Sequence, residues 1–277
     1  MKISKVLIAV AAATLAVSVI NAQQKSKIYG VDDPAARTIP DGALSSVVSQ
    51  FTGSVNVAFT TKHVFRGVEK TNAAIQPSVL LEHESGAYFG AFFNVPFSHV
   101  REAEYDFNLG YSHKLNEKLT LDGGIVLYLT PGFEYQGQDL RKWTQEFYLG
   151  GTYNITSNFG SRVYFYYDAR CEQITSELAL GYALPLSPIH SYMPANLNFS
   201  VYIGYSSGND VLPDANMGKV SDDYSYYGVS VEAPVRLTSR LACNIGVQYG
   251  RSHNYLLGPI GDNSSHFWAF GSLKYDF

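Results

Sequence analysis

Residues 265–277 alternate between two kinds of side chain. One set of alternate positions is apolar and aromatic: Phe267, Ala269, Gly271, Leu273, Tyr275 and Phe277. The other set mixes charge, hydroxyl groups and rings: His266, Trp268, Phe270, Ser272, Lys274 and Asp276. Because successive side chains of a β-strand point to opposite faces, this pattern predicts a strand between two different solvents. A strand of a transmembrane β-barrel has this pattern, with lipid on one face and a polar lumen on the other.

The same alternation recurs along the chain and predicts an all-β fold, a transmembrane antiparallel up-and-down β-barrel of about twelve strands. It is clearest where Leu109 falls outward while Asp106 and Asn108 fall inward. In the first strand the pattern places Phe65 outward. The predicted strands cover residues 54–66, 74–84, 87–97, 104–112, 119–129, 143–155, 158–168, 175–184, 196–206, 224–233, 240–250 and 265–277.

The connections between the predicted strands differ in length at the two edges of the barrel. One edge has the short connections, at residues 84–86, 116–118, 156–157 and 234–239. The opposite edge has long ones, at residues 131–142, 207–223 and 251–264. Outer-membrane barrels have short periplasmic turns and long outer loops, so we expect both chain ends at the periplasmic edge. The connection at 185–195 is the exception, because it is long on the short edge.

The amino terminus predicts export. Residues 1–22 have the form of a secretory signal peptide, since Lys2 and Lys5 precede an apolar core at 6–19. Residues 23–50 are polar and lack strand alternation, so we expect a flexible periplasmic segment there. The barrel is expected to occupy residues 51–277. An exported barrel belongs in the bacterial outer membrane, in contact with its lipids.

The composition excludes several classes of protein. Charged residues make up 16% of the chain, against about 25% in ordinary globular proteins. No long apolar run follows the first segment, which excludes a helical membrane protein. The net charge is -4 and there is no basic tract, so no nucleic-acid partner is expected. Cys171 and Cys243 are predicted well apart around the barrel, and the sequence leaves open whether they pair.

The predicted inward faces carry charges of both signs, with acids in excess. The candidate lumen-lining residues are Lys62, Arg66, Glu82, Glu84, Glu104, Asp106, Asp122, Glu146, Arg162, Asp168, Glu177 and Arg240. A barrel of about twelve strands lies between small barrels filled by side chains and large ones with an open channel. The charges therefore form either a salt-bridged plug or a narrow polar path. A path with excess carboxylate would prefer cations or admit small neutral solutes.

Two features of this interior have more than one interpretation. Arg66 is either a fixed charge near the outer mouth of the lumen or a turn arginine paired with Glu82 or Glu104. Inward aromatic rings could stack on sugars, although packing of the lumen is the simpler interpretation. These aromatic residues are Tyr88, Phe92, Tyr128, Tyr148, Tyr164, Tyr166 and Tyr202.

Two other functions remain as alternatives to a pore. An outer-membrane lipid hydrolase would need a nucleophile, a base and an orienting group within hydrogen-bond reach. Ser252, His253 and Asn254 supply these types, and Ser191 lies beside His190, but no lipase-like motif surrounds either set. A structural or surface-display barrel would need neither catalytic residues nor an open pore. The seven histidines are scattered and no phosphate-binding glycine loop is present, so we expect no metal and no cofactor.

The first strand ends in Phe-Arg-Gly at 65–67, and further motifs follow at 74–77, 83–86, 104–111 and 128–132. In this order they resemble the TorF family of candidate outer-membrane porins, although the chain departs from that family at 224–227. The terminal Tyr275 and Phe277 resemble the signal read by the barrel assembly machinery. The resemblance implies an outer-membrane barrel. With the predicted lumen, it leads us to expect a porin-like channel for passive diffusion of small polar solutes, and not an enzyme.

Overall fold

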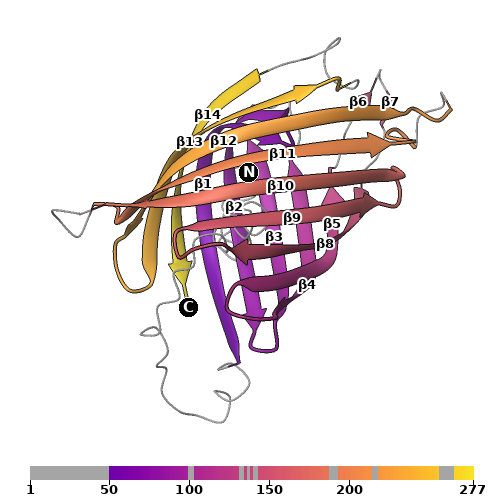
Figure 1. Ribbon diagram of the computed structural model, residues 1–277. Coiled ribbons are helices and arrows are strands. Elements are labelled where there is room, and N and C mark those ends of the chain that lie inside the picture. The colour runs from indigo at the N-terminus through magenta and orange to yellow at the C-terminus, as the bar shows by residue number, and fades with distance from the viewer. Residues whose placement is uncertain are drawn as a thin grey trace.

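The chain folds into a closed barrel of antiparallel strands (Figure 1). The computed structural model describes residues 50–98, 103–130, 134–135, 138–139, 143–186, 193–213, 218–255 and 265–277. The predicted signal peptide, 1–22, and residues 23–49 of the predicted periplasmic segment lie outside the described residues. The described part contains no helix long and apolar enough to cross a membrane.

The strands are β1 Phe51–Phe65, β2 Val68–His83, β3 Ala87–Pro96, β4 Glu104–Lys114, β5 Leu119–Leu129, β6 Glu134–Tyr135, β7 Gln138–Asp139, β8 Trp143–Asn154, β9 Phe159–Asp168, β10 Gln173–Pro185, β11 Asn196–Gly208, β12 Asp222–Arg236, β13 Leu241–His253 and β14 Ser265–Asp276. The short strands β6 and β7 form a separate sheet. The other twelve form the barrel in the order β1-β14-β13-β12-β11-β10-β9-β8-β5-β4-β3-β2. The prediction of an antiparallel barrel of about twelve strands is confirmed.

The first and last strands close the barrel. β1 pairs with β14 in a register that places Ser54 opposite Asp276. Beyond this pair, the Phe277 N–H donates to the Gly53 carbonyl at 2.9 Å, and the Gly53 N–H donates back at 3.1 Å. Both ends of the barrel therefore lie at one edge. Because a strand edge left unpaired in lipid is costly, this ladder makes a membrane-spanning sheet possible.

The two edges of the barrel differ less in connection length than the sequence suggested. The edge with both barrel ends, here called the turn edge, has connections at 84–86, 115–118, 155–158, 186–195 and 237–240. The opposite edge, here called the loop edge, has connections at 66–67, 97–103, 130–142, 169–172, 209–221 and 254–264. Two loop-edge connections, 66–67 and 169–172, are short turns. The connection 186–195 is long at the turn edge, where the sequence also placed its exception.

The outer and inner faces of the wall have opposite polarity. Leu149 and Phe267 are 65% and 64% exposed on the outer face, whereas Asn94 and Ser206 are fully buried inside. The closing strand follows its predicted faces, since Phe267 lies outside and Trp268 inside. A soluble protein would bury its apolar face and expose its polar one. This inverted arrangement, with exposed aromatic and aliphatic side chains on every barrel strand except β2, suits a barrel that spans a membrane.

Tyrosine rings on the inner face lie against glycines of the neighbouring strand. Gly204 in β11 is opposite Tyr226 in β12, and a Cβ atom on Gly204 would stand 2.6 Å from Cε1 of that ring. Tyr202 and Gly228 form the reciprocal pair. Each ring therefore occupies space on the wall that a neighbouring side chain would otherwise fill. The pairing lets large aromatic residues line a narrow interior.

We predict that Gly204→Ala destabilises the barrel, because the new methyl group would overlap the buried Tyr226 ring. Overpacking of this kind typically costs about 1–3 kcal/mol. The matched control is Gly271→Ala, since a Cβ there would meet its nearest neighbour, Ile245, only at 3.8 Å. Urea unfolding of the refolded protein should separate the two variants. Equal unfolding midpoints would show that the ring moves aside without cost.

Candidate functional site

The hairpin of β1 and β2 leaves the barrel wall before it reaches the loop edge. β1 pairs with β14 only as far as Thr60, which lies opposite Phe270. On the other side, the Phe97 N–H donates to the Ala73 carbonyl at 3.0 Å, and no pairing of β2 with β3 extends further. Among the described strands, residues 61–72 therefore pair only with each other. We call this segment the β1–β2 arm.

The arm contains a β-bulge. His63 lies opposite Thr71 and Val64 lies opposite Glu69, so Lys70 is the additional residue of β2. A bulge kinks its strand and changes which face the following side chains take. Phe65, predicted to face outward, instead packs against the interior Tyr128 with a ring separation of 6.1 Å. The prediction for Phe65 is wrong because this part of β1 has left the wall, so neither of its faces meets lipid.

The tip of the arm is a tight turn made by Arg66 and Gly67. Both residues have positive φ, of 50° and 75°, as the two central residues of a type I′ hairpin require. The Gly67 position also needs a missing side chain, since a Cβ there would lie 2.6 Å from the Arg251 carbonyl oxygen of β13. Figure 1 shows the loop-edge ends of β1 and β2 curving toward the orange and yellow strands.

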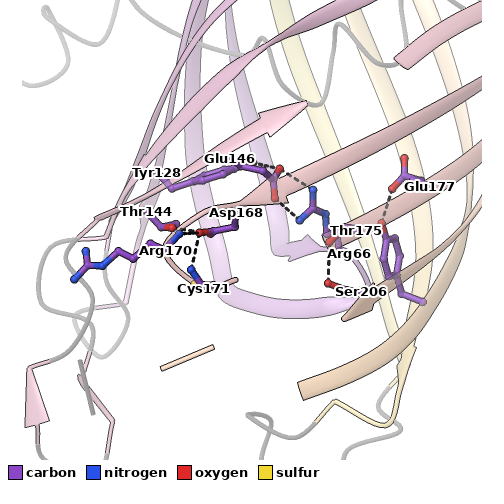
Figure 2. Close-up of polar contacts among 11 residues, drawn as sticks. Arg66, Tyr128, Thr144, Glu146, Asp168, Arg170, Cys171, Thr175, Glu177 and Ser206 are labelled. Atoms are coloured by element: carbon purple, nitrogen blue, oxygen red, sulfur yellow. Dashed lines mark hydrogen bonds and ion pairs between the residues drawn. The ribbon is translucent and has the colours of Figure 1, made fainter. Parts of the chain in front are cut away.

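Arg66 forms a bidentate ion pair with Glu146 of β8. Its Nη1 and Nη2 atoms each donate to one carboxylate oxygen at 2.8 Å, and both side chains are more than nine-tenths buried. The Tyr128 hydroxyl donates to the same carboxylate at 3.2 Å. The guanidinium carbon lies 4.5 Å from the centre of the Tyr166 ring and 4.7 Å from that of Phe65. Figure 2 shows Arg66 inside the barrel with its guanidinium turned toward Glu146.

This ion pair lies across the barrel from the base of the arm. In the order of the closed sheet, β9 stands six steps from β1, which is halfway around the twelve strands. Arg66 nevertheless contacts Tyr166 of β9. Six extended residues, from the base at Thr60 to the tip, reach about 20 Å. The arm therefore crosses the interior from one wall to the opposite one.

Ion pairs and a histidine hold the sides of the arm. Lys62 Nζ donates to Glu69 at 2.6 Å, and the ring of His266 in β14 approaches the same carboxylate oxygen at 3.1 Å. His63 lies 3.3 Å from Glu104 of β4. The side chain of His63 is buried inside the barrel. His63 lies in the part of β1 that has left the wall, and the sequence gives no local signal for this departure.

Further charged groups are held within the wall itself. Arg162 of β9 donates to Glu177 of β10 at 2.9 Å, and the Tyr226 hydroxyl donates to the same carboxylate at 3.1 Å. Asp122 accepts hydrogen bonds from Tyr88 at 2.8 Å and from Tyr164 at 2.9 Å. Asp122, Arg162 and Glu177 thus lie inside the barrel and hold its strands together.

Asp168 organises the short turn between β9 and β10. Its carboxylate accepts hydrogen bonds from Thr144 at 2.6 Å and from the backbone N–H groups of Arg170 and Cys171, each at 2.9 Å (Figure 2). Beyond this turn, Lys219 donates to Glu172 at 2.6 Å, and this hydrogen bond raises the pKa of Lys219 above its ordinary value. The role of Asp168 is therefore local to the turn.

The remaining candidate residues take different positions. Glu84 and Arg240 lie in exposed turns at the turn edge, outside the strands. Glu82 is half-buried in β2, whereas Asp106 is buried in β4 with no hydrogen-bond partner for Oδ1 among the described residues. The sequence had suggested that Arg66 pairs with Glu82 or Glu104, but it pairs with neither of them. Its partner is Glu146, 80 residues away.

The interior is accessible to solvent on the turn-edge side of β13, β14 and β1. Lys274 and Asp276 form an ion pair at 2.8 Å, with side chains 44% and 46% exposed. Deeper along this wall, the inward-facing Asn56, Asn244 and Ser272 are still partly exposed, whereas Glu232, which accepts a hydrogen bond from Asn244 at 2.9 Å, is buried. The barrel therefore has a polar vestibule at the turn edge and the arm beyond it.

The proposed catalytic residues are not arranged for catalysis. Ser252 is buried inside the barrel, while His253, the next residue of β13, is exposed on the opposite face. His190 and Ser191 lie outside the described residues.

In the described part, no three His, Cys, Asp or Glu side chains are grouped to hold a metal ion. Cys171 and Cys243 are both free thiols.

A closed barrel with an apolar outer face and a charged interior is the architecture of a transmembrane β-barrel. A family model described as "Bacterial protein of unknown function (Gcw_chp)" matches residues 45–189, just over half of the chain. The chain therefore belongs to the Gcw_chp family.

Solved structures share the fold at low sequence identity. The KdgM porin is similar with a TM-score of 0.51 and 10% identity, over 81% of this chain and 99% of that one. The KdgM porin in complex with disordered oligogalacturonate is similar with a TM-score of 0.51 and 9% identity, over 82% and 99%. No curated protein sequence matches the chain. At this identity the likeness concerns the fold alone.

We predict that Glu177→Ala destabilises the barrel, because it leaves Arg162 buried without its carboxylate and removes the acceptor of the Tyr226 hydroxyl. Removing one partner of a buried ion pair costs about 3–5 kcal/mol. The double variant Arg162→Met with Glu177→Leu should recover most of this loss. Urea unfolding checks both variants, with Glu172→Ala as an exposed control. A double variant no more stable than the single one would contradict the assignment.

Proposed function

We propose that this protein is an outer-membrane channel for passive diffusion of small polar solutes. The observation that carries the proposal is the polar, solvent-accessible vestibule inside a closed barrel with an apolar outer face. A barrel that served only as a membrane anchor would not need a hydrophilic interior open to one side. The shared fold with the KdgM porin supports the same reading.

The charges of the interior favour cations and neutral solutes. Among the described inward-facing residues, acids outnumber lysines and arginines, and Glu232 is one of these acids. Carboxylates along a pore disfavour anions. One KdgM structure is a complex with oligogalacturonate, which is a polyanion. We propose that this chain differs in its solutes and does not favour polyanions.

The proposed channel sits with its turn edge in the periplasm. Short turns and both barrel ends at that edge support this orientation. Tyr275 and Phe277 are exposed on the outer face of the closing strand, where we propose that the barrel assembly machinery reads them. We further propose that the chain is of the TorF type, on the motifs that lie within the region matched by the family model.

The direct test is the current through the refolded wild-type protein in a planar bilayer, with a salt gradient to measure selectivity. We expect discrete conductance steps and a reversal potential of the sign for cation preference. Glu232→Gln should move the reversal potential toward zero, because it removes one carboxylate from the interior. Glu172→Gln, the same change at an exposed loop-edge site, should leave the reversal potential unchanged.

Two outcomes would contradict the proposal. Clear anion preference would overturn the assigned selectivity. A correctly folded barrel without conductance in the wild type and in every variant would favour a structural or surface-display barrel. An esterase assay with a Ser252→Ala control would then test the hydrolase alternative.

A further inference from the structure

We propose that the β1–β2 arm, residues 61–72, is an internal gate of the channel and that the Arg66–Glu146 ion pair is its latch. In the closed state the arm crosses the interior, as described above. In the open state it returns to the barrel wall by extending the ladder between β1 and β14. The inference rests on the proposed channel function and specifies how that channel is regulated.

The arm closes the barrel at the loop edge. Its tip rests on the backbone of Arg251 and Ser252 in β13, and Arg66 reaches Glu146 on the other side. Tyr226, Ser252 and Glu146, which lie on different strands at this level, are 1%, 2% and 3% exposed, so little of the interior here is open to water. The vestibule at the turn edge, by contrast, is accessible. The passage is thus blocked where the arm lies.

The arm is attached only through side chains and through its base. No described strand pairs with residues 61–72 other than the arm itself. The contacts that hold it include the ion pairs of Arg66 with Glu146 and of His63 with Glu104, and the contact of His266 with Glu69. Hydrogen bonds from Asn94 to Thr71 and from the Ala269 N–H to Thr61 add to them. The arm can therefore leave the interior without breaking any backbone ladder of the wall.

The wall offers a defined place for the arm to go. The register of β1 with β14 runs from Ser54 opposite Asp276 to Thr60 opposite Phe270. β14 continues to Ser265, while β1 has already turned inward. In the same register, residues 61–65 would lie opposite residues 269–265. The Ala269 N–H already donates a hydrogen bond of 3.0 Å to the Thr61 hydroxyl. The Thr61 side chain thus takes the place of the backbone acceptor that an extended ladder would supply.

The sequence pattern agrees with this second arrangement. Val55, Val57 and Phe59 form the outward set of β1, and strict alternation would place Phe65 in that set as well. In the closed state Phe65 lies inside, against Tyr128, because the arm has left the wall. In the open state it would join the apolar outer face, while Lys62 and Arg66 would face the lumen. The chain thus carries a strand pattern that only the open state satisfies.

The latch is tested with Glu146→Gln, which keeps the shape of the side chain but removes its charge. Single-channel recordings should show the open fraction raised by about tenfold or more, because the buried guanidinium loses its counter-charge. Exchanging the two residues, Arg66→Glu with Glu146→Arg, restores the ion pair and should lower the open fraction again. Glu172→Gln is the matched control and should behave as the wild type.

The open state is tested with a disulfide between Phe65→Cys and Ser265→Cys, in a background with Cys171→Ser and Cys243→Ser. In the proposed open register these two residues lie directly opposite each other. In the closed state Phe65 instead packs on Tyr128. Oxidation should cross-link the pair and fix the channel open, and reduction should restore gating. The single Phe65→Cys variant controls for loss of the ring.

The outcomes separate the gate from the channel. Conductance steps that are the same in the wild type, in Glu146→Gln and in the oxidised disulfide variant would overturn the gate and leave the channel standing. A pair of cysteines that never cross-links would overturn the open register. Silence of the cross-linked barrel, shown to be folded by its circular dichroism spectrum, would overturn the channel and the gate with it.

Discussion

Backbone hydrogen bonding in an apolar solvent is the constraint on which this structure depends. In lipid each unpaired backbone group costs several kcal/mol, so a sheet must close on itself. The ladder between β1 and β14 closes it here. The remaining features follow from closure: the outer face must be apolar, the polar side chains must turn inward, and inward charges must find partners inside. The ion pairs of Arg66, Arg162 and Lys62 are the result.

Much of this fold could be predicted from the period-two pattern, because alternation directly reports the two solvents of the wall. Strands such as β4 and β14 have their predicted faces, and the number of strands is correct. The pattern gives wrong faces where a segment is no longer part of the wall between the two solvents. Beyond Thr60 the arm leaves the wall and no longer lies between lipid and lumen. Phe65 was therefore placed on the wrong face.

The candidate site was predictable in its composition but not in its pairing. Lys62, Asp122, Arg162 and Glu177 do lie inside the barrel, as alternation suggested. The partner of Arg66 could not be found this way, since Glu82 and Glu104 are nearer in the sequence whereas Glu146 lies across the barrel. Which strands face each other depends on closure and on the bend of the arm. The approach of the Tyr226 ring to Gly204 depends on register in the same way.

The arm also imposes an order on folding. Its turn is local, and hairpins form in microseconds, so the arm can exist early as an isolated ribbon. Its resting place cannot, because β13 and β8 flank the interior only after the last strand has met the first. Contacts between segments far apart in sequence form late and slowly. The arm therefore takes its place after the wall has closed, across an interior that the side chains of the wall already line.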